Sequence, residues 1–160
     1  MSNIKVAIMM GSESDLPTLE EAAKILKDFG VGYEMRVLSA HRTPKECAAY
    51  AEELKSKGVK VAICGAGGSA ALAGVVAAHT AIPVIGIPIE STALSGMDSL
   101  LSTVQMPPGV PVASVAIGKS GAKNAALLAL RILALSDKTI DKKLEKYRNE
   151  QREKILKIKV

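Results

Sequence analysis

Aromatic side chains are scarce in this sequence: they make up 2% of 160 residues, and tryptophan is absent. Proteins that bind single-stranded nucleic acids stack the bases on aromatic rings. The shortage of rings therefore argues against a nucleic-acid-binding protein. It also leaves few side chains that could sandwich a flavin.

Cysteine and histidine number only two each. Cys47 and Cys64 have no metal-type or CxxC spacing, so we expect two reduced thiols, as in a cytoplasmic protein. With so few candidate ligands, no transition-metal site is expected. No apolar run is long enough for a membrane helix, and no signal-peptide pattern precedes the strand pattern that begins at Ile4. We therefore expect a cytoplasmic protein without membrane contact.

The net charge of +5 is concentrated in one segment. Residues 137–160 carry nine Lys or Arg against five Asp or Glu, whereas the remainder of the chain is nearly balanced. The basic excess is interpreted as the solvated face of a last helix and not as a nucleic-acid-binding surface.

Strand-like and helix-like patterns alternate along the whole chain. The predicted strands are residues 4–10, 33–38, 59–64, 83–89 and 112–117. The predicted helices are residues 16–29, 43–57, 69–79, 93–104, 121–135 and 137–158. This order predicts a single α/β domain over residues 1–160, with a three-layer, doubly wound parallel five-stranded sheet of flavodoxin-like or Rossmann-like type and an extra C-terminal helix.

The two last helices point to self-association. Residues 121–135 are apolar almost all round, which is typical of a helix buried on more than one side. The charged last helix keeps an apolar stripe that includes Ile140, Leu144 and Ile155. We expect a homo-oligomer, in which residues 137–160 pack on a neighbouring subunit.

Polar or glycine-rich loops follow three of the predicted strands, and the carboxyl ends of parallel strands meet at one edge of a sheet. The first loop contains Gly11, Ser12, Ser14 and Asp15. Glycine permits close backbone approach, and hydroxyls and helix N–H groups suit a phosphate. Because Asp15 would repel a phosphate, its carboxylate is expected to cap the helix or accept ribose hydroxyls. A plain helix cap is the alternative.

The second loop contains Ser39, Ala40, His41 and Arg42 and runs into a helix start. Histidine is the usual acid–base group near neutral pH, and arginine can bind a phosphate or carboxylate through two hydrogen bonds. We therefore predict that His41 transfers protons on an anionic substrate. The alternative is a histidine that only holds the loop. Thr43-Pro44-Lys45-Glu46 predicts a capping box at the start of the next helix.

The third loop contains Gly65, Ala66, Gly67, Gly68 and Ser69. It matches the dinucleotide-binding pattern G-x-G-x-x-G/A, but it follows the third strand and not the first. We interpret it as a wall for close substrate contacts. A non-catalytic nucleotide- or flavin-binding module is the alternative that this loop leaves open.

Taken together, these motifs resemble the phosphoribosylaminoimidazole carboxylase catalytic-subunit family, which includes the 5-(carboxyamino)imidazole ribonucleotide mutases. The matching segments are residues 10–15, 39–44, 65–68, 93–100, 105–107 and 118–128. The resemblance implies a purine-biosynthesis enzyme that moves the carboxylate of an imidazole ribonucleotide from the exocyclic nitrogen to the ring carbon, without metal, biotin or ATP. It also implies a flavodoxin-like homo-octamer with sites between subunits.

The resemblance assigns ribonucleotide binding to Ser12, Asp15 and Arg42 and general acid–base catalysis to His41. Leu72, which follows the third matching segment, is included among the substrate-binding candidates. One departure concerns Ala71, which stands where mutases of this family carry a second histidine. A carboxylase that uses aminoimidazole ribonucleotide and free carbon dioxide therefore remains an alternative to the mutase.

Overall fold

Short apolar segments form a parallel sheet with the strand order β2-β1-β3-β4-β5 in the computed structural model, which describes residues 4–91 and 93–159. The strands are β1 (Ile4–Met10), β2 (Gly32–Val37), β3 (Val61–Gly67), β4 (Val84–Ile89) and β5 (Ala113–Ser114). This order is that of flavodoxin-like folds, so the predicted doubly wound α/β fold is confirmed.

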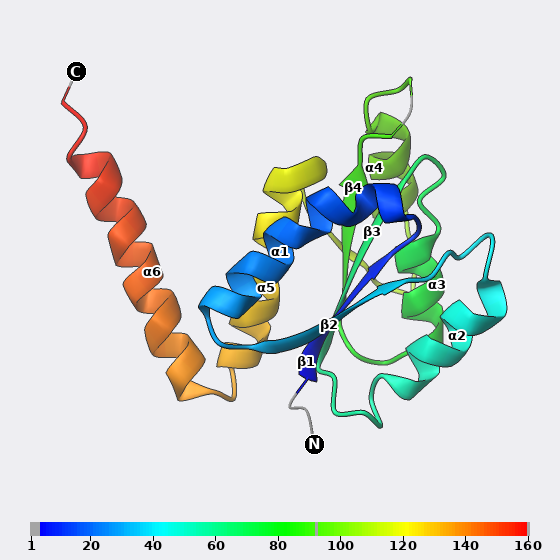
Figure 1. Cartoon of the computed structure of the whole chain (residues 1–160), viewed down its shortest axis with the longest axis horizontal. Coiled ribbons are helices and arrows are strands. Elements are labelled where there is room, and N and C mark those ends of the chain that lie inside the picture. The colour runs from blue at the N-terminus through cyan, green and yellow to red at the C-terminus, as the bar shows by residue number, and fades with distance from the viewer. Residues whose placement is uncertain (1–3, 92, 160) are drawn as a thin grey trace.

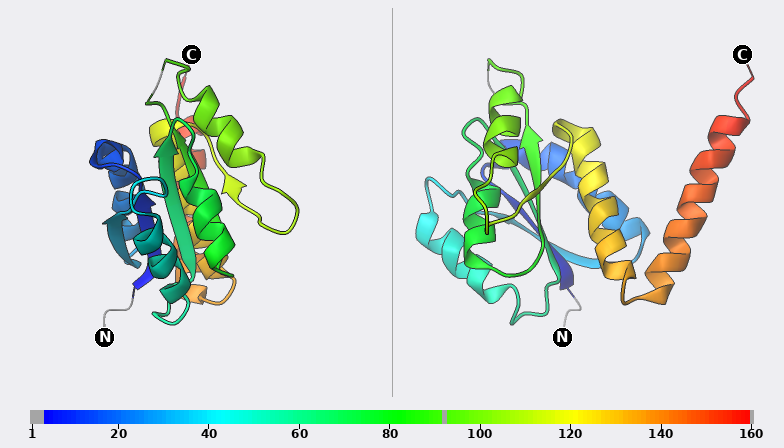
Figure 2. Two further views of the ribbon diagram at one scale, coloured as in Figure 1. Left: turned by 90° about the vertical axis from the view of Figure 1, so that its right-hand side faces the viewer. Right: turned by 180° about the vertical axis from the view of Figure 1, so that it is seen from behind.

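Helices cover both faces of the sheet (Figures 1 and 2). One face carries α1 (Leu16–Asp28) and α5 (Gly118–Ala134), and the other carries α2 (Pro44–Glu53), α3 (Leu72–His79) and α4 (Met97–Val104). A short 3-10 helix, η1 (Glu13–Asp15), precedes α1, and α6 (Lys138–Leu156) follows α5.

The central strands alternate between the two layers of core. Val6 and Ile8 of β1 pack into the core beneath α1 and α5, whereas Ala7 and Met9 pack beneath α2 and α3. All four side chains are fully buried. Successive strand residues point to opposite faces, so a strand covered on both sides reads as one continuous apolar run. This is why β1 is recognisable in the sequence.

The end of β3 differs from the prediction. The strand was expected at residues 59–64 but spans Val61–Gly67, so the first residues of the predicted glycine loop belong to the sheet. They do so because Gly67 still pairs with Ile89 at the end of β4. The edge strand β5 is shorter than predicted. The sequence predicts residues 112–117, but only Ala113 and Ser114 pair with β4.

Several predicted helix bounds are also wrong. The starts of α3 and α4 lie three to four residues beyond the predicted ones, because Ala70 (φ 38°) and Ser95 (φ 51°) adopt left-handed backbone conformations that cannot continue a right-handed helix. α2 ends at Glu53, and the turn that follows closes at Gly58, whose φ is +83°. α5 begins at Gly118, before the predicted residue 121, and α6 spans Lys138–Leu156 within the predicted 137–158.

α6 leaves the body of the molecule after its first turns (Figure 1). Ile140 and Leu144 are buried against the core, and Lys143 donates a hydrogen bond of 2.7 Å to the carbonyl of Phe29. The ring of Tyr147 meets that of Phe29 edge-on at 5.9 Å. Beyond this point the helix is exposed, including its apolar residues Ile155 and Leu156, and so is Ile158 just after its end.

Candidate functional site

The loops after β1, β2, β3 and β4 enclose one pocket of about 360 Å³ at the carboxyl edge of the sheet. It is lined by Gly11, Ser12, Ser14, Asp15, Ser39, Ala40, His41, Arg42, Ala66, Gly67, Ala70, Ala71, Leu72 and Ser91. The chain crosses from β1 to β2 on one side and later to β3 on the other, and ligands of open α/β sheets bind at such a switch point. Four loops that are distant in the sequence therefore share one site.

The first loop is held by its own polar groups. The backbone N–H of Ser12 donates to Oδ2 of Asp15 at 3.1 Å, and the Ser12 hydroxyl accepts from the N–H of Ser14 at 3.4 Å. These two contacts form a capping box at the start of η1. The capping interpretation of Asp15 is thus seen in the structure, while the hydroxyls of Ser12 and Ser14 stay at the pocket surface.

Asp15 is one of the few buried charged side chains among the described residues, with 5% of its surface exposed. Burial raises the pKa of this carboxyl above its ordinary value of 3.8. The hydrogen bond from Ser12 and the positive charge of Arg42 oppose that effect. The pocket therefore contains a carboxyl group whose charge depends on neighbours from two different loops.

The second loop is closed by hydrogen bonds around Ser39. Its N–H donates to the hydroxyl of Thr43 at 2.9 Å, and that hydroxyl donates to the Ser39 carbonyl at 3.1 Å. Thr43 is the N-cap residue of α2, but its side chain caps no N–H of that helix. The predicted capping box with Glu46 is therefore wrong, because the Thr43 hydroxyl turns back to close the loop.

Arg42 connects the first and second loops. Its Nη2 donates to the carbonyl of Gly11 at 2.6 Å, and its Nε lies 3.4 Å from the hydroxyl of Ser39. A guanidinium has five N–H donors, so these contacts leave others for an anion in the pocket. Arg42 thereby fixes the spacing between the loops that follow β1 and β2.

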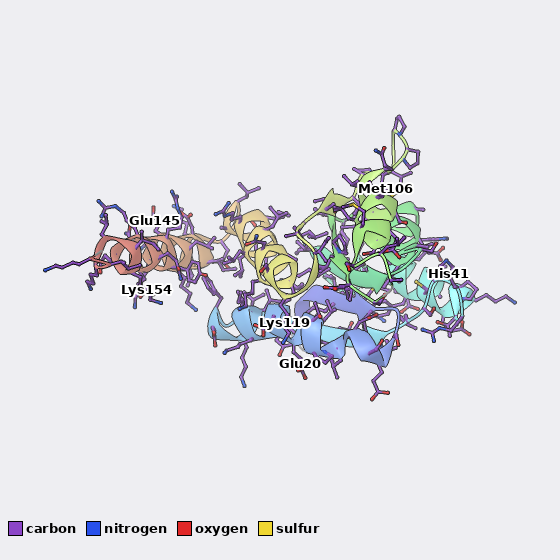
Figure 3. All side chains as sticks on the ribbon, turned by 90° about the horizontal axis from the view of Figure 1, so that it is seen from above. Glu20, His41, Met106, Lys119, Glu145 and Lys154 are labelled. Carbon is purple, nitrogen blue, oxygen red and sulfur yellow. The ribbon has the colours of Figure 1, made fainter. Side chains whose placement is uncertain are left out.

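His41 lies at the rim of the pocket, with an exposed side chain. Figure 3 looks onto the carboxyl edge of the sheet, and His41 lies beside α2, far from Glu145 and Lys154 of α6. No described residue forms a hydrogen bond with its ring. The imidazole is free to meet a ligand, which fits the predicted proton transfer better than a role in holding the loop.

The third loop places only part of the predicted set in the pocket. Ala66 and Gly67 line it, but Gly65 lies within β3, where an added Cβ would meet Leu19 at 2.6 Å. Gly68 and Ser69 are in the turn after β3 and are not among the lining residues. Binding by these three residues stays a prediction.

Ala70, Ala71 and Leu72 complete this wall of the pocket. Ala71 is the N-cap of α3 and has no side-chain group that could cap it or titrate. Leu72 is almost fully buried. Among the pocket-lining residues, the acid–base groups are therefore Asp15 and His41, with Arg42 as the permanent cation.

Three lining residues were not among the predicted site residues: Ala70, Ala71 and Ser91. Ser91 is the one that carries a polar side chain. It follows β4, the fourth strand to reach this edge, and the topology rule applied to the other three strands also covers it. The signal was available in the sequence as a serine two residues after the apolar run of β4.

The remaining reactive side chains lie outside the pocket. His79 at the end of α3 pairs with Glu52 of α2 at 3.0 Å, and burial raises the pKa values of the Cys47 and Cys64 thiols.

Among the described residues, no three His, Cys, Asp or Glu side chains are grouped as metal ligands would be. In the same part of the chain, no helix combines the length and apolarity needed to cross a membrane.

Known proteins resemble this chain over most of its length. The family model described as AIR carboxylase matches residues 5–154. The N5-carboxyaminoimidazole ribonucleotide mutase of Pyrococcus abyssi is 60% identical over 148 residues, which cover 92% of this chain and 84% of that protein. The mutase of Vibrio parahaemolyticus is 55% identical over 153 residues, which cover 96% of this chain and 95% of that protein.

A solved structure, that of PurE from Treponema denticola, has a TM-score of 0.86 and 37% sequence identity and covers 94% of this chain and 93% of that chain. The resemblance inferred from the loop motifs is thereby confirmed. This chain belongs to the AIR carboxylase family.

Proposed function

We propose that this chain is an N5-carboxyaminoimidazole ribonucleotide mutase of purine biosynthesis, an isomerase that forms 4-carboxy-5-aminoimidazole ribonucleotide. The observation that carries the proposal is that His41, Asp15 and Arg42 line one pocket at the switch point of the sheet. Curated relatives at 60% and 55% identity bear the name of this mutase.

The pocket offers separate partners for each part of the ribonucleotide. The free N–H donors of Arg42 and the hydroxyls of Ser12 and Ser14 suit the phosphate. The carboxylate of Asp15 suits ribose hydroxyls when it is ionised. The backbone at Ala66 and Gly67 lets a flat ring and its carboxylate approach closely, since neither side chain is larger than a methyl group.

One histidine is sufficient for the proton transfers of this reaction. As the N–C bond of the carbamate breaks, His41 in its protonated form donates a proton to the exocyclic nitrogen, and carbon dioxide is released. The ring carbon then attacks carbon dioxide and forms the new C–C bond. Neutral His41 removes the proton from that carbon, which restores the ring and the original state of the histidine. No net proton is consumed.

The released carbon dioxide must be recaptured before it diffuses away. Holding it beside the ring carbon replaces a bimolecular encounter by an intramolecular one, which gives a large effective concentration. The small residues Gly67, Ala70 and Ala71 leave room for such a molecule beside the ring.

The replacement His41→Asn tests the proposed catalyst. It keeps a polar side chain at an exposed position but cannot transfer protons, so kcat should fall by about 10²-fold or more. The melting temperature and the dissociation constant for the product nucleotide should change little. His79→Asn is the matched control, because this histidine pairs with Glu52 outside the pocket. Near-normal turnover of His41→Asn would contradict the proposal.

The carboxyl donor needs a second experiment, because Ala71 lines the pocket where mutases of this family carry a histidine. The purified chain is assayed with the carbamate nucleotide alone and with aminoimidazole ribonucleotide plus bicarbonate. The mutase predicts efficient turnover of the first, and the carboxylase predicts turnover of the second only. Micromolar binding of a flavin or dinucleotide without turnover of either would favour the non-catalytic module.

We further propose a homo-oligomer, an octamer by resemblance to the family, in the cytoplasm. The exposed apolar residues at the end of α6 support self-association. So does a second exposed apolar stripe formed by α4 and the turn before it, which consists of Leu94, Met97, Leu101 and Val104. The buried, free thiols of Cys47 and Cys64 suit a reducing compartment. Sedimentation velocity of the purified chain measures the number of subunits, and a monomer at micromolar concentration would contradict this proposal.

A further inference from the structure

Ser91 presents an unused hydroxyl to the pocket. Its side chain is exposed at the lip formed by the end of β4, and it forms no hydrogen bond with any described residue. Each other serine hydroxyl at the pocket has a partner within its loop: those of Ser12 and Ser39 accept hydrogen bonds, and that of Ser14 donates to Ser12. Ser91 therefore supplies a donor that the protein itself does not occupy.

The Ser91 side chain also packs against Gly67. A Cβ at Gly67 would lie 1.8 Å from Oγ of Ser91 and 2.6 Å from its Cβ, so the two residues touch with no space for a side chain. The carbonyl of Ile89 lies at 3.1 Å from the same point. Gly67 is thus the residue that admits the Ser91 side chain to the wall of the pocket.

Ser99 of α4 fixes the backbone that carries Ser91. Its hydroxyl is fully buried and lies 3.0 Å from the carbonyl of Ile89 and 2.9 Å from that of Gly96. These carbonyls flank the loop after β4 on both sides. The hydroxyl therefore joins the beginning and the end of that loop in a place that water does not reach.

We propose that Ser91 contacts the ribonucleotide through a hydrogen bond to one of its oxygens and that Ser99 is the residue that positions it. In the sheet, β4 is three strands from β2, about 14 Å along the edge, so Ser91 acts at the end of the pocket remote from His41. Its contribution is to binding and not to proton transfer. This inference rests on the proposed function for the identity of the ligand.

The test compares Ser91→Ala, Ser99→Ala and the double variant in KM, kcat and calorimetric affinity for aminoimidazole ribonucleotide. Each single replacement should raise KM and weaken binding by about fivefold to tenfold, the usual effect of losing one hydrogen bond, with kcat changed less than twofold. If Ser99 acts through Ser91, the double variant should be no weaker than Ser91→Ala alone.

Two variants of the same helix serve as matched controls. Ser102→Ala removes an exposed hydroxyl, and Thr103→Val removes a buried one that bonds only to the carbonyl of Ser99 within α4. Thr103→Val should therefore lower the melting temperature, as Ser99→Ala does, but it should leave KM and binding unchanged.

An unchanged affinity in Ser91→Ala overturns the contact, and additive losses in the double variant overturn the positioning role of Ser99. The calorimetric readout separates this inference from the proposed function. A chain that fails to turn over the carbamate nucleotide, yet binds aminoimidazole ribonucleotide in a manner dependent on Ser91, contradicts the mutase assignment and supports the contact.

Discussion

Asp15 shows how one side chain can serve both the fold and the pocket. Its carboxylate accepts the N–H of Ser12 and so shapes the first loop, while the burial that this position entails raises its pKa. The unfolded chain therefore loses this proton at a lower pH than the folded chain. At pH values above the ordinary pKa, folding must bury an ionised carboxylate, and this makes folding less favourable.

The sign of the pH effect follows from proton counting. Between pH 3.8 and the raised folded pKa of Asp15, the unfolded state binds fewer protons, so the free energy of unfolding falls as the pH rises. The variant Asp15→Asn should lack this fall, because its amide does not titrate and can still accept from Ser12. Urea unfolding of both proteins at several pH values measures the difference. Parallel pH profiles would contradict the assigned cause.

Two glycines of β3 have different reasons to be glycine. A Cβ at Gly65 would meet Leu19 at 2.6 Å inside the core, whereas a Cβ at Gly67 would meet Ser91 at the pocket. Gly65→Ala should cost about 1–3 kcal/mol of folding free energy through overpacking and keep kcat/KM. Gly67→Ala should lower kcat/KM by about fivefold to tenfold by displacing Ser91. Thermal unfolding and steady-state kinetics of the pair distinguish these effects, and loss of activity in Gly65→Ala alone would reverse the assignment.

At the scale of elements, α2 is attached to the edge strand β2 by one short hydrogen bond. The hydroxyl of Tyr50 donates to Oε1 of Glu34 at 2.6 Å, and the Arg36 guanidinium lies 5.5 Å from the ring centre. Burial and the neighbouring carboxylate raise the pKa of Tyr50, so it remains a donor throughout the physiological range. The loop that carries His41 connects these two elements.

Removing this attachment should loosen the edge of the sheet. Tyr50→Phe deletes only the hydroxyl and should lower the free energy of unfolding by about 1 kcal/mol, because the partly buried carboxylate of Glu34 loses its hydrogen-bond donor. Tyr33→Phe, on the same edge strand, is the control. Urea denaturation at neutral pH measures both, and equal stability of the two variants would show that the hydrogen bond is not stabilising.

The same elements show what could be predicted from the sequence. Central strands such as β1 are buried on both faces, so their apolar runs are plain, and the loops after β1 and β2 contain the residues seen in the pocket. The starts of α3 and α4 could not be predicted from the pattern of apolar residues. Ala70 and Ser95 adopt left-handed conformations that tertiary packing imposes and that neither residue type favours. The extension of β3 to Gly67 likewise depends on its pairing with Ile89.

At the scale of the whole molecule, apolar surface is unevenly distributed. The body is covered on both faces of the sheet, whereas the end of α6 and the residues just after it expose Ile155, Leu156 and Ile158, each at 64% or more. Figure 2 shows the same helix standing apart from the sheet in the view from behind. A second copy of the chain is the proposed cover for these residues.

This proposal predicts the effect of charge on α6. The double replacement Ile155→Lys with Leu156→Lys should shift the protein to smaller assemblies, because two buried cations at a contact are costly. Gln151→Lys adds one positive charge to the exposed part of the same helix and should leave the assembly unchanged. Sedimentation velocity at several concentrations compares the three proteins. An unchanged distribution in the double variant would show that this half of α6 is not covered by another subunit.

Because α6 projects from the body, the thermal stability of the protein should also depend on its concentration. Its first turns are fastened to the body through Lys143 and Tyr147, whereas in the proposed oligomer the distal turns pack on another subunit, and the occupancy of that contact follows mass action. The midpoint of thermal unfolding should therefore rise with protein concentration. At high dilution, the distal turns of α6 should exchange their amide protons with solvent before the sheet does.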